Sequence, residues 1–207
     1  MNYLVSPVSN GWSISSLNLG RHTRGSYIQR IKQGLIMSNK YGVRVASIND
    51  ESGVSAVLAA SYPALMAAAY SPEFLASAVP LMTKAQPHLL ISGTYYVACA
   101  MDDHIVGCGG WTMERPHSGE VAIGLAHLRQ FAVAPQWTGR GVGRAIYDSC
   151  AAEAKSADVT QFECYASLNA EGFYAALGFR TVKPLNVRMT DELTLASLLM
   201  ERRLVTQ

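Results

Sequence analysis

Three glycines in five positions stand out in the stretch VAPQWTGRGVGRAIYD, residues 133–148. Gly139, Gly141 and Gly143 separate an apolar run from an alanine-rich segment with the composition of a helix. Each glycine costs about 0.5–1 kcal/mol relative to alanine there, so this spacing implies a compensating role. Amides at a helix N-terminus bind anions, and the missing Cβ atoms let a phosphate approach them. The alternative is an ordinary glycine-rich turn without a ligand.

Two common phosphate-binding motifs do not fit this stretch. A P-loop requires a lysine followed by serine or threonine, whereas this chain has Arg144 followed by Ala145. The dinucleotide motif G-x-G-x-x-G requires a glycine three positions after its second glycine, and Arg144 occupies that position. The sequence therefore disfavours a nucleotide-binding module.

The stretch FAVAPQWTGRGVGRAIYD, residues 131–148, closely resembles the acyl-CoA-binding segment of the GNAT N-acetyltransferase superfamily. The family's turn reads [QR]-x-x-G-x-[GA], and Thr138 stands here in place of the usual Gln or Arg. Residues 169–179, NAEGFYAALGF, resemble a second family motif with an Asn, a Tyr and an L-G-F ending. The closing LLMERRL resembles the family's final strand, so the resemblance extends over about residues 41–204.

This resemblance implies an α+β fold with a mixed, mostly antiparallel central sheet of six to seven strands. About four helices flank the sheet, which is splayed between its fourth and fifth strands. The implied cofactor is acetyl-CoA, with its pantetheine arm along the backbone of the strand that ends at Val133 and its phosphates at the glycine turn. The cofactor-binding residues carried over from the resemblance are Phe131, Ala132, Val133, Thr138, Gly139, Arg140, Gly141, Val142, Gly143, Arg144, Asn169 and Tyr174.

Acetylation of an amine requires the neutral amine and a proton donor for the departing thiolate. A lysine-like amine with a pKa near ~10.4 is only about 0.04% neutral at pH 7, so a general base contributes to the rate. Tyr174 matches the family's tyrosine and is the predicted donor, since a phenol with a pKa of ~10 is protonated at pH 7. The alternative role of Tyr174 is that of a core residue bonded to a carbonyl.

His127 is the first candidate for the base, directly or through water, and Glu120 is the second. The strand AHLRQFAV resembles that of arylalkylamine-type acetyltransferases, in which a histidine occupies the position of His127. Strict alternation places His127 and Arg129 on the same face as Phe131 and Val133, and therefore beside the cofactor. A histidine titrates near ~6.5, which suits a base at neutral pH. The alternative is a structural histidine.

The acceptor is predicted to be a primary amine of a small molecule, a peptide or a protein. Arg129 stands where the related subfamily has a second histidine, and a cation there attracts a substrate carboxylate; its alternative role is an ion pair with a nearby acid. Tyr62 and Tyr70, in ASYPALMAAAYSPEFL, are predicted to offer an apolar wall to the acceptor. Their helical spacing is more often that of core residues.

Local sequence signals predict the elements that position these residues. Asn49 or Asp50 can cap a helix over 51–69, in which Pro63 is a possible kink or loop, and Pro72 suits the first turn of the next helix. Gly178 is a natural end for the helix that contains Tyr174. Strands are predicted at 41–48, 94–103, 104–114, 124–135, 161–167, 179–189 and 195–204, and an alanine-rich helix at 142–156.

Residues 1–40, rich in Ser, Asn and Gly, are predicted to be an N-terminal extension, disordered or loosely packed, before an acetyltransferase domain at 41–207. Of the 207 residues, 49% are hydrophobic, which is enough for a substantial core. The net charge of +2 and scattered basic residues argue against a nucleic-acid partner, and the five histidines show no metal-ligand spacing. The four cysteines are expected to be reduced.

No stretch approaches ~20 uninterrupted apolar residues, which argues against a membrane span. The chain is therefore expected to be cytoplasmic, with a homodimer possible. Two functions remain open on the sequence: an acetyl-CoA-dependent N-acetyltransferase that transfers the acetyl group directly in a ternary complex, or a non-catalytic acyl-CoA-sensing module of the same fold. Tyr174 together with His127 favours the enzyme.

Overall fold

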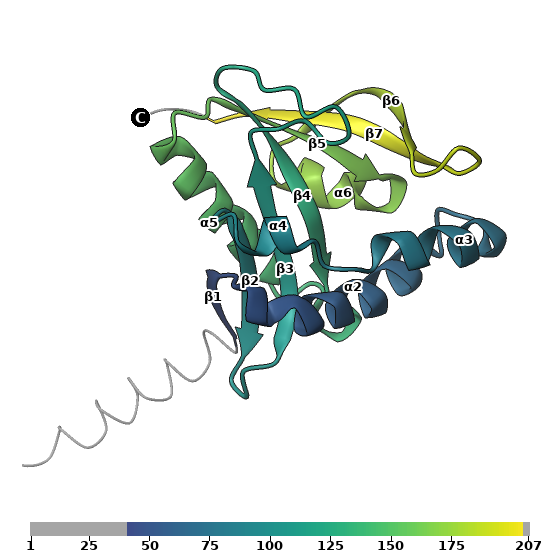
Figure 1. The fold of residues 1–207 in the computed structure, drawn as a ribbon, viewed down its shortest axis with the longest axis horizontal. Helices are drawn as coiled ribbons and strands as arrows, with labels where there is room; N and C mark the ends of the chain where they lie inside the picture. The colour runs from purple at the N-terminus through teal and green to yellow at the C-terminus, as the bar shows by residue number, and fades with distance from the viewer. Residues whose placement is uncertain (1–40, 205–207) are drawn as a thin grey trace, which may run out of the picture. The chain divides into compact units, whose positions relative to one another are not determined.

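Seven strands form one sheet in residues 41–204, the part of the chain that the computed structural model describes (Figure 1). The strands are β1 (Tyr41–Val45), β2 (Tyr95–Ala100), β3 (Ile105–Thr112), β4 (Leu125–Val133), β5 (Gln161–Ser167), β6 (Arg180–Arg188) and β7 (Thr194–Arg203). Their order is β1-β2-β3-β4-β5-β7-β6, and β4 and β5 form the single parallel pair. The predicted mixed, mostly antiparallel sheet is confirmed.

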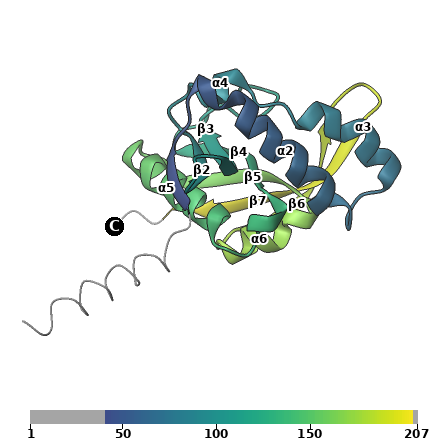
Figure 2. The same ribbon diagram turned by 90° about the horizontal axis from the view of Figure 1, so that it is seen from below.

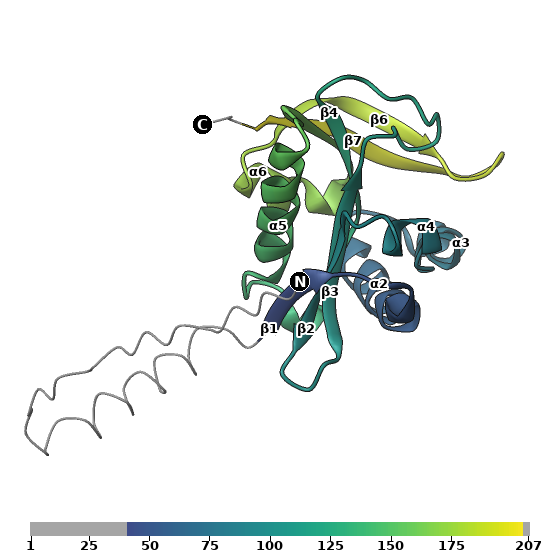
Figure 3. The same cartoon turned by 60° about the vertical axis from the view of Figure 1, so that its left-hand side comes forward.

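Helices cover both faces of this sheet (Figure 3). The α-helices of the described part are α2 (Glu51–Met66), α3 (Pro72–Met82), α4 (Pro87–Leu90), α5 (Val142–Ser156) and α6 (Glu171–Ala176). Short 3-10 turns are η1 (Ile48–Asp50), η2 (Pro135–Trp137) and η3 (Leu168–Ala170). The sequence suggested about four helices, and the additional one is the four-residue α4.

Two clusters of buried side chains hold the layers together. The larger cluster joins α5 and α6 to one face of the sheet, and the smaller joins α2 and α4 to the opposite face. We name these the α5 face and the α2 face. Figure 2 shows α2 lying across the strands of its face, with α3 continuing toward the β6–β7 hairpin.

Local capping explains where the helices begin and end. Ser71 accepts a hydrogen bond from the amide of Phe74 at 3.2 Å, with Pro72 in the first turn of α3 as predicted. Gly178, with φ at +89°, follows the end of α6. Pro63 lies inside α2, which continues to Met66, so the structure has no loop at Pro63.

Some predictions concern residues other than 41–204, or the location and assembly of the protein. The predicted N-terminal extension, residues 1–40, lies outside the described residues. Within the described part, no helix is both long and apolar enough to cross a membrane. All four cysteines are free, and Cys108, Cys150 and Cys164 are buried. The cytoplasmic location and the homodimer stay predictions.

Candidate active site

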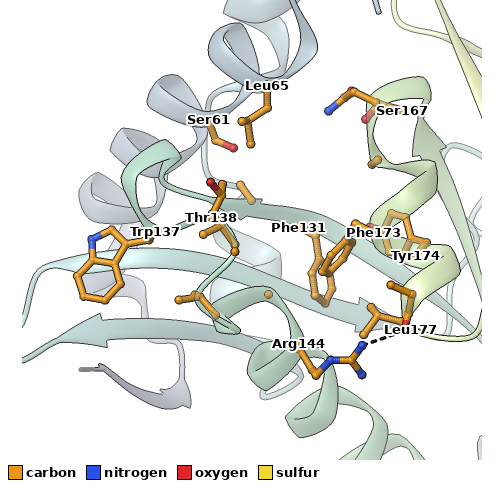
Figure 4. Close-up of a pocket in the computed structure, with 18 of the residues that line it drawn as sticks. Ser61, Leu65, Phe131, Trp137, Thr138, Arg144, Ser167, Phe173, Tyr174 and Leu177 are labelled. Atoms are coloured by element: carbon orange, nitrogen blue, oxygen red, sulfur yellow. Dashed lines mark hydrogen bonds between the residues drawn. The ribbon is translucent and has the colours of Figure 1, made fainter. Parts of the chain in front are cut away.

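A cavity of about 490 Å³ opens where α2, the end of β4, the start of α5, and α6 converge (Figure 4). Ser61 and Leu65 border it from α2, while the rings of Phe131 and Phe173 lie side by side at its centre, next to Tyr174. Its remaining lining residues are Tyr62, Met66, Ala132, Val133, Trp137, Thr138, Gly139, Gly141, Val142, Gly143, Arg144, Ser167, Asn169, Ala170, Ala176 and Leu177. We call this cavity the cofactor cavity.

Strands β4 and β5 separate to make room for the cofactor cavity. They pair over only three rows, Leu125 with Gln161, Ala126 with Phe162, and His127 with Glu163. Beyond His127, β4 continues to Val133 without pairing to β5. Its backbone amides and carbonyls on that side are therefore free to bond an extended ligand. The predicted splay between the fourth and fifth strands is confirmed.

The glycine turn at the start of α5 presents free amides to the same cavity. Gly139 and Gly141 have φ angles of +71° and +82°, which favour glycine, and Gly141 is the N-cap of α5. The amide of Ala145 bonds the carbonyl of Gly141 at 2.9 Å and closes the first helical turn. The amides of residues 142–144 precede that bond, so they have no helical acceptor and can bind an anion.

Two arginines flank this turn in different ways. Arg144 lines the cofactor cavity and donates from Nη2 to the carbonyl of Ala176 at 2.8 Å. The guanidinium of Arg140 lies 5.2 Å from the ring centroid of Trp137, and Arg140 does not line the cavity. Thr138 donates from its hydroxyl to the carbonyl of Pro135 at 2.8 Å, which holds the turn in place.

Tyr174 sits in an aromatic cluster at the wall of the cofactor cavity. Its ring centroid lies 5.0 Å from that of Phe173, 5.5 Å from that of Phe179 and 6.4 Å from that of Phe131. The residue is 7% exposed, and burial raises the pKa of its phenol well above 10. The hydroxyl therefore keeps its proton at neutral pH, and it bonds no other residue of the described chain.

A β-bulge at Gln130 overturns the predicted alternation along β4. The register between β3 and β4 shifts here, and Gln130 has a φ of +45°. On one side of the bulge, Phe131 packs over Gly109, where a Cβ atom would lie 2.7 Å from the Phe131 ring. On the other side, His127 pairs with Thr112 on the α2 face. The prediction that His127 and Arg129 share a face with Phe131 and Val133 was wrong.

His127 is almost fully enclosed on the α2 face. It is 1% exposed, and its Nδ1 lies 3.7 Å from Oε2 of Glu163. Burial, together with the guanidinium groups of Arg115 and Arg129, lowers the pKa of His127 to about 4. The imidazole is therefore neutral at pH 7, the form that can accept a proton.

The other predicted site residues lie in different places. Arg129 is partly buried, donates to the hydroxyl of Thr112 at 3.0 Å and has no carboxylate partner within residues 41–204. Glu120 is exposed on the β3–β4 loop, 3.8 Å from Nε of Arg115, and does not line the cofactor cavity. Tyr62 lines the cavity.

Tyr70 is occupied by a structural role. Its hydroxyl donates to the carbonyl of Ala196 at 2.7 Å and accepts from the amide of Leu168 at 2.8 Å. Tyr70 thereby links the segment between α2 and α3 to β7 and η3. It does not line the cofactor cavity, so the structure does not bring it together with Tyr62.

Residues 66–190, more than half of the chain, match the family model described as an acetyltransferase (GNAT) domain. The chain belongs to the GNAT acetyltransferase family. Acetyl-CoA is the acetyl donor that this family uses. No curated protein matches the chain closely enough to count as a relative.

Solved structures with the same fold include several GNAT enzymes. The PaiA N-acetyltransferase of Thermoplasma acidophilum, in complex with coenzyme A, is 19% identical, with a TM-score of 0.62 over 80% of this chain and 99% of that one. A GCN5-related N-acetyltransferase of Rhodopseudomonas palustris is 23% identical, with a TM-score of 0.63 over 81% and 98%. The N-acetylglutamate synthase of Neisseria gonorrhoeae is 16% identical, with a TM-score of 0.52 over 80% and 35%.

Sequence reasoning missed two notable residues of this GNAT domain. Phe173 fills the centre of the cofactor cavity, and its position next to Tyr174 in FYAALGF was the available signal. Glu163 faces His127 across the parallel strands. Alternation in QFECYAS indicates that Glu163 lies on the face opposite Phe162 and Cys164, but the pairing with His127 depends on the register of two distant strands.

Proposed function

We propose that the protein is an acetyl-CoA-dependent N-acetyltransferase that transfers the acetyl group to a primary amine within a ternary complex. The observation that carries this proposal is the convergence of three features on one cavity. The free amides of the glycine turn, the unpaired edge of β4 and the protonated hydroxyl of Tyr174 all border it. A binding module would not need the third feature.

The residues present fit acetyl-CoA. The amides of residues 142–144 suit the pyrophosphate, and Gly139 and Gly141 leave no side chain in its way. The free edge of β4 at Phe131–Val133 suits the amide groups of the pantetheine arm. Thr138, Asn169 and Arg144 border the cavity as further polar contacts. Arg140 stacks on Trp137 beside the glycine turn, and we assign it a contact with the phosphates of acetyl-CoA.

Bound acetyl-CoA supplies a thioester whose carbonyl carbon is open to attack by a neutral amine. Tyr174 then donates its phenolic proton to the departing thiolate sulfur and regains a proton from solvent. Because burial raises the pKa of the phenol well above 10, its proton is still present at neutral pH when the thiolate departs. The nitrogen–carbon bond forms as the carbon–sulfur bond breaks, and the surplus proton of the nitrogen goes to the base.

His127 is assigned as the base that acts through a neighbouring group. Its neutral imidazole can accept a proton, but its burial prevents direct contact with a bulky amine. Glu120 lies on the exposed β3–β4 loop and bonds Ser118, so it is the weaker candidate. The acceptor enters on the α2 face, where His127 and Arg129 lie.

An amine that carries a carboxylate is the acceptor class that Arg129 supports. Its guanidinium is partly buried and has no carboxylate partner within the described residues. Burial lowers the pKa of Arg129, which makes a charged partner more favourable than water alone. Tyr62 offers an aromatic surface beside the cofactor cavity for an apolar part of the acceptor.

Calorimetric titration with acetyl-CoA, coenzyme A, ATP and NAD tests this function first. We expect acetyl-CoA to bind and the Gly141→Val variant to lose that binding, because valine is strained at a φ of +82°. Gly42→Val is the matched control, since a Cβ at Gly42 meets nothing within 4 Å. Thiol release with L-phenylalanine, L-glutamate, phenethylamine and spermidine then tests transfer. Binding without release from any amine would favour the acyl-CoA-sensing module.

A further inference from the structure

His127 and Glu163 form the last paired row before β4 and β5 separate. Because the strands part immediately beyond this row, its side chains stand at the closed end of the splay. Both lie on the α2 face, with Nδ1 of His127 3.7 Å from Oε2 of Glu163. Each of these two atoms is buried and has no hydrogen-bond partner within residues 41–204. A small side-chain rotation would let them share a proton.

The two members of this pair differ in accessibility. The side chain of Glu163 is 13% exposed, whereas that of His127 is 2% exposed. Glu163 therefore forms the outer end of the pair and His127 the inner end. A carboxylate in this position can meet an ammonium group directly, which the enclosed imidazole cannot do.

A second hollow is lined by two neighbours of Glu163, Arg115 and Tyr165. Its volume is about 470 Å³, and the β3–β4 loop, β5 and β6 line it through residues that include Arg115, Tyr165 and Arg188. Nη2 of Arg115 lies 3.9 Å from Oε2 of Glu163, and Tyr165 is two residues from Glu163 on the same face of β5. We call this space the acceptor hollow.

We propose that Glu163 is a catalytic residue that takes the proton of an acceptor amine arriving through the acceptor hollow. This inference rests on the proposed function. The ammonium group of the acceptor gives one proton to the Glu163 carboxylate and becomes a neutral amine with a free electron pair. Glu163 shares that proton with Nδ1 or passes it to water, and so returns to the carboxylate. His127 acts through Glu163 and is a positioning residue.

The charges around Glu163 are consistent with this role. Arg115 lies near Glu163 and belongs to the β3–β4 loop, while His127 and Arg129 belong to β4. Glu201 pairs with Glu163 in the register of β5 and β7. Glu201 is already engaged, since it accepts from Gln161 at 3.1 Å and pairs with Arg180. Within residues 41–204, Oε2 of Glu163 has only the two longer approaches of 3.7 Å and 3.9 Å, so the carboxylate has no charged partner at hydrogen-bond distance.

The Glu163→Gln variant tests the proposal, with Glu201→Gln as the matched control on the neighbouring strand. The probe amine is the one with the highest turnover among L-phenylalanine, L-glutamate, phenethylamine and spermidine. We expect kcat/KM of Glu163→Gln to fall by roughly 100-fold or more, the usual range for loss of a general base. Its affinity for acetyl-CoA should stay within about twofold of the wild type, and Glu201→Gln should keep kcat/KM within about threefold.

The pH profile separates a proton acceptor from a structural carboxylate. With Glu163 present, kcat/KM should be flat from pH 6 to 8, because the enzyme removes the proton. In Glu163→Gln it should rise about tenfold per pH unit, because only amine that is already neutral reacts. Glu163→Asp, which keeps the charge, should recover part of the rate and a flat pH profile. This variant replaces Glu163→Gln in the test if Glu163→Gln does not fold.

Histidine-selective ¹⁵N NMR of the protein without acetyl-CoA supplies a readout that is independent of turnover. The signal of Nδ1 of His127 should change in Glu163→Gln and not in Glu201→Gln. If Glu163→Gln turns over within threefold of the wild type with the same pH profile, the inference falls and the proposed function stands. If the wild type acetylates no amine of the panel, both fall, and the NMR signal then decides only whether Glu163 contacts His127.

Discussion

His127 and Phe131 are four residues apart on β4, yet their side chains leave the sheet on opposite faces. Regular alternation would place them on one face, and the bulge at Gln130 inserts the extra residue that separates them. The hydroxyl of Tyr95 donates to the carbonyl of Gln130 at 3.1 Å and holds the bulge in place. One strand thereby packs Phe131 and Val133 against the α5-face cluster and places His127 on the α2 face.

Removal of the Tyr174 hydroxyl should slow the chemical step and leave cofactor binding intact. For Tyr174→Phe we expect kcat to fall roughly 100-fold or more, since the departing thiolate loses its proton donor. The ring and its contacts remain, so the affinity for acetyl-CoA should change by less than about threefold. Because burial raises the pKa of Tyr174 well above 10, the wild type should show no alkaline loss of kcat from this residue up to pH 10.

Tyr147→Phe is the control for this experiment. The ring centroid of Tyr147 lies 5.8 Å from that of Phe179, and the ring centroid of Tyr174 lies 5.5 Å from that of Phe179. Unlike Tyr174, Tyr147 does not line the cofactor cavity. Steady-state kinetics with a thiol-release readout compares the two variants. Equal kcat values in both would remove Tyr174 from the chemistry and leave it as a core tyrosine.

A methyl group at Gly143 should disturb the floor of the cofactor cavity. A Cβ atom there would lie 2.8 Å from Cε2 of Phe173, so that ring has to move. For Gly143→Ala we expect a loss of about 1 kcal/mol in the free energy of unfolding, since crowding of about 1–3 kcal/mol exceeds the gain in helix propensity of about 0.5–1 kcal/mol. The Kd for acetyl-CoA should rise, as calorimetry can measure.

Gly172→Ala is the matched substitution, because a Cβ at this position in α6 meets nothing within 4 Å. Here only the helix propensity changes, so the variant should gain about 0.5–1 kcal/mol and bind acetyl-CoA as the wild type does. A Gly143→Ala variant that is as stable as Gly172→Ala and binds equally well would contradict the close packing of Phe173.

The acceptor class assigned through Arg129 can be tested with two amines that differ by one carboxylate. L-phenylalanine and phenethylamine share the aromatic ring and the primary amine. For Arg129→Gln we expect kcat/KM for L-phenylalanine to fall about 10–100-fold, the usual effect of losing a charge-assisted hydrogen bond. The value for phenethylamine should change by less than about threefold.

Arg180→Gln provides the comparison, since Arg180 pairs with Glu201 on the exposed β6 strand. It should leave both amines unaffected. An equal fall for the two amines in Arg129→Gln would indicate a structural role of the guanidinium, through its bond to Thr112, and would remove the carboxylate from the acceptor class.

Features set by neighbours in sequence were predictable from the chain alone. The helix at 142–156, its glycine start and the stop at Gly178 follow from local backbone preferences. The cofactor-binding part of the cavity was predictable for the same reason, because two of the segments that line it, residues 131–144 and 169–174, carry recognisable spacing. These segments bring eleven of the twelve predicted cofactor-binding residues to the cavity, and Arg140 lies outside it.

Features set by strand register could not be predicted in this way. The bulge at Gln130 depends on how β4 pairs with β3, and the contact of His127 with Glu163 depends on how β4 pairs with β5. Tyr70 shows the same effect at longer range, since the partners of its hydroxyl are Leu168 and Ala196. Side-chain periodicity within one segment carries no information about such partners.

The start of α2 makes a pH-dependent contribution to stability through Asp50. Arg44 donates to its carboxylate from Nη1 at 2.8 Å and Nη2 at 2.7 Å, and the amide of Ser47 donates at 2.7 Å. These bonds, above all those from Arg44, lower the pKa of Asp50 to about 2. A carboxyl whose pKa is lower in the folded state stabilises that state above its unfolded pKa of ~3.9 and loses this contribution as the pH falls.

We therefore expect Asp50→Asn to lower the free energy of unfolding by about 1–2 kcal/mol at pH 7. The difference from the wild type should shrink between pH 4 and pH 2, because the wild-type carboxyl becomes protonated over that range. Asp148→Asn, on an exposed position of α5, should stay within about 0.5 kcal/mol at every pH. Urea unfolding at pH 7, 4 and 2.5 measures all three proteins, and a difference that is independent of pH would contradict the ion pair between Arg44 and Asp50.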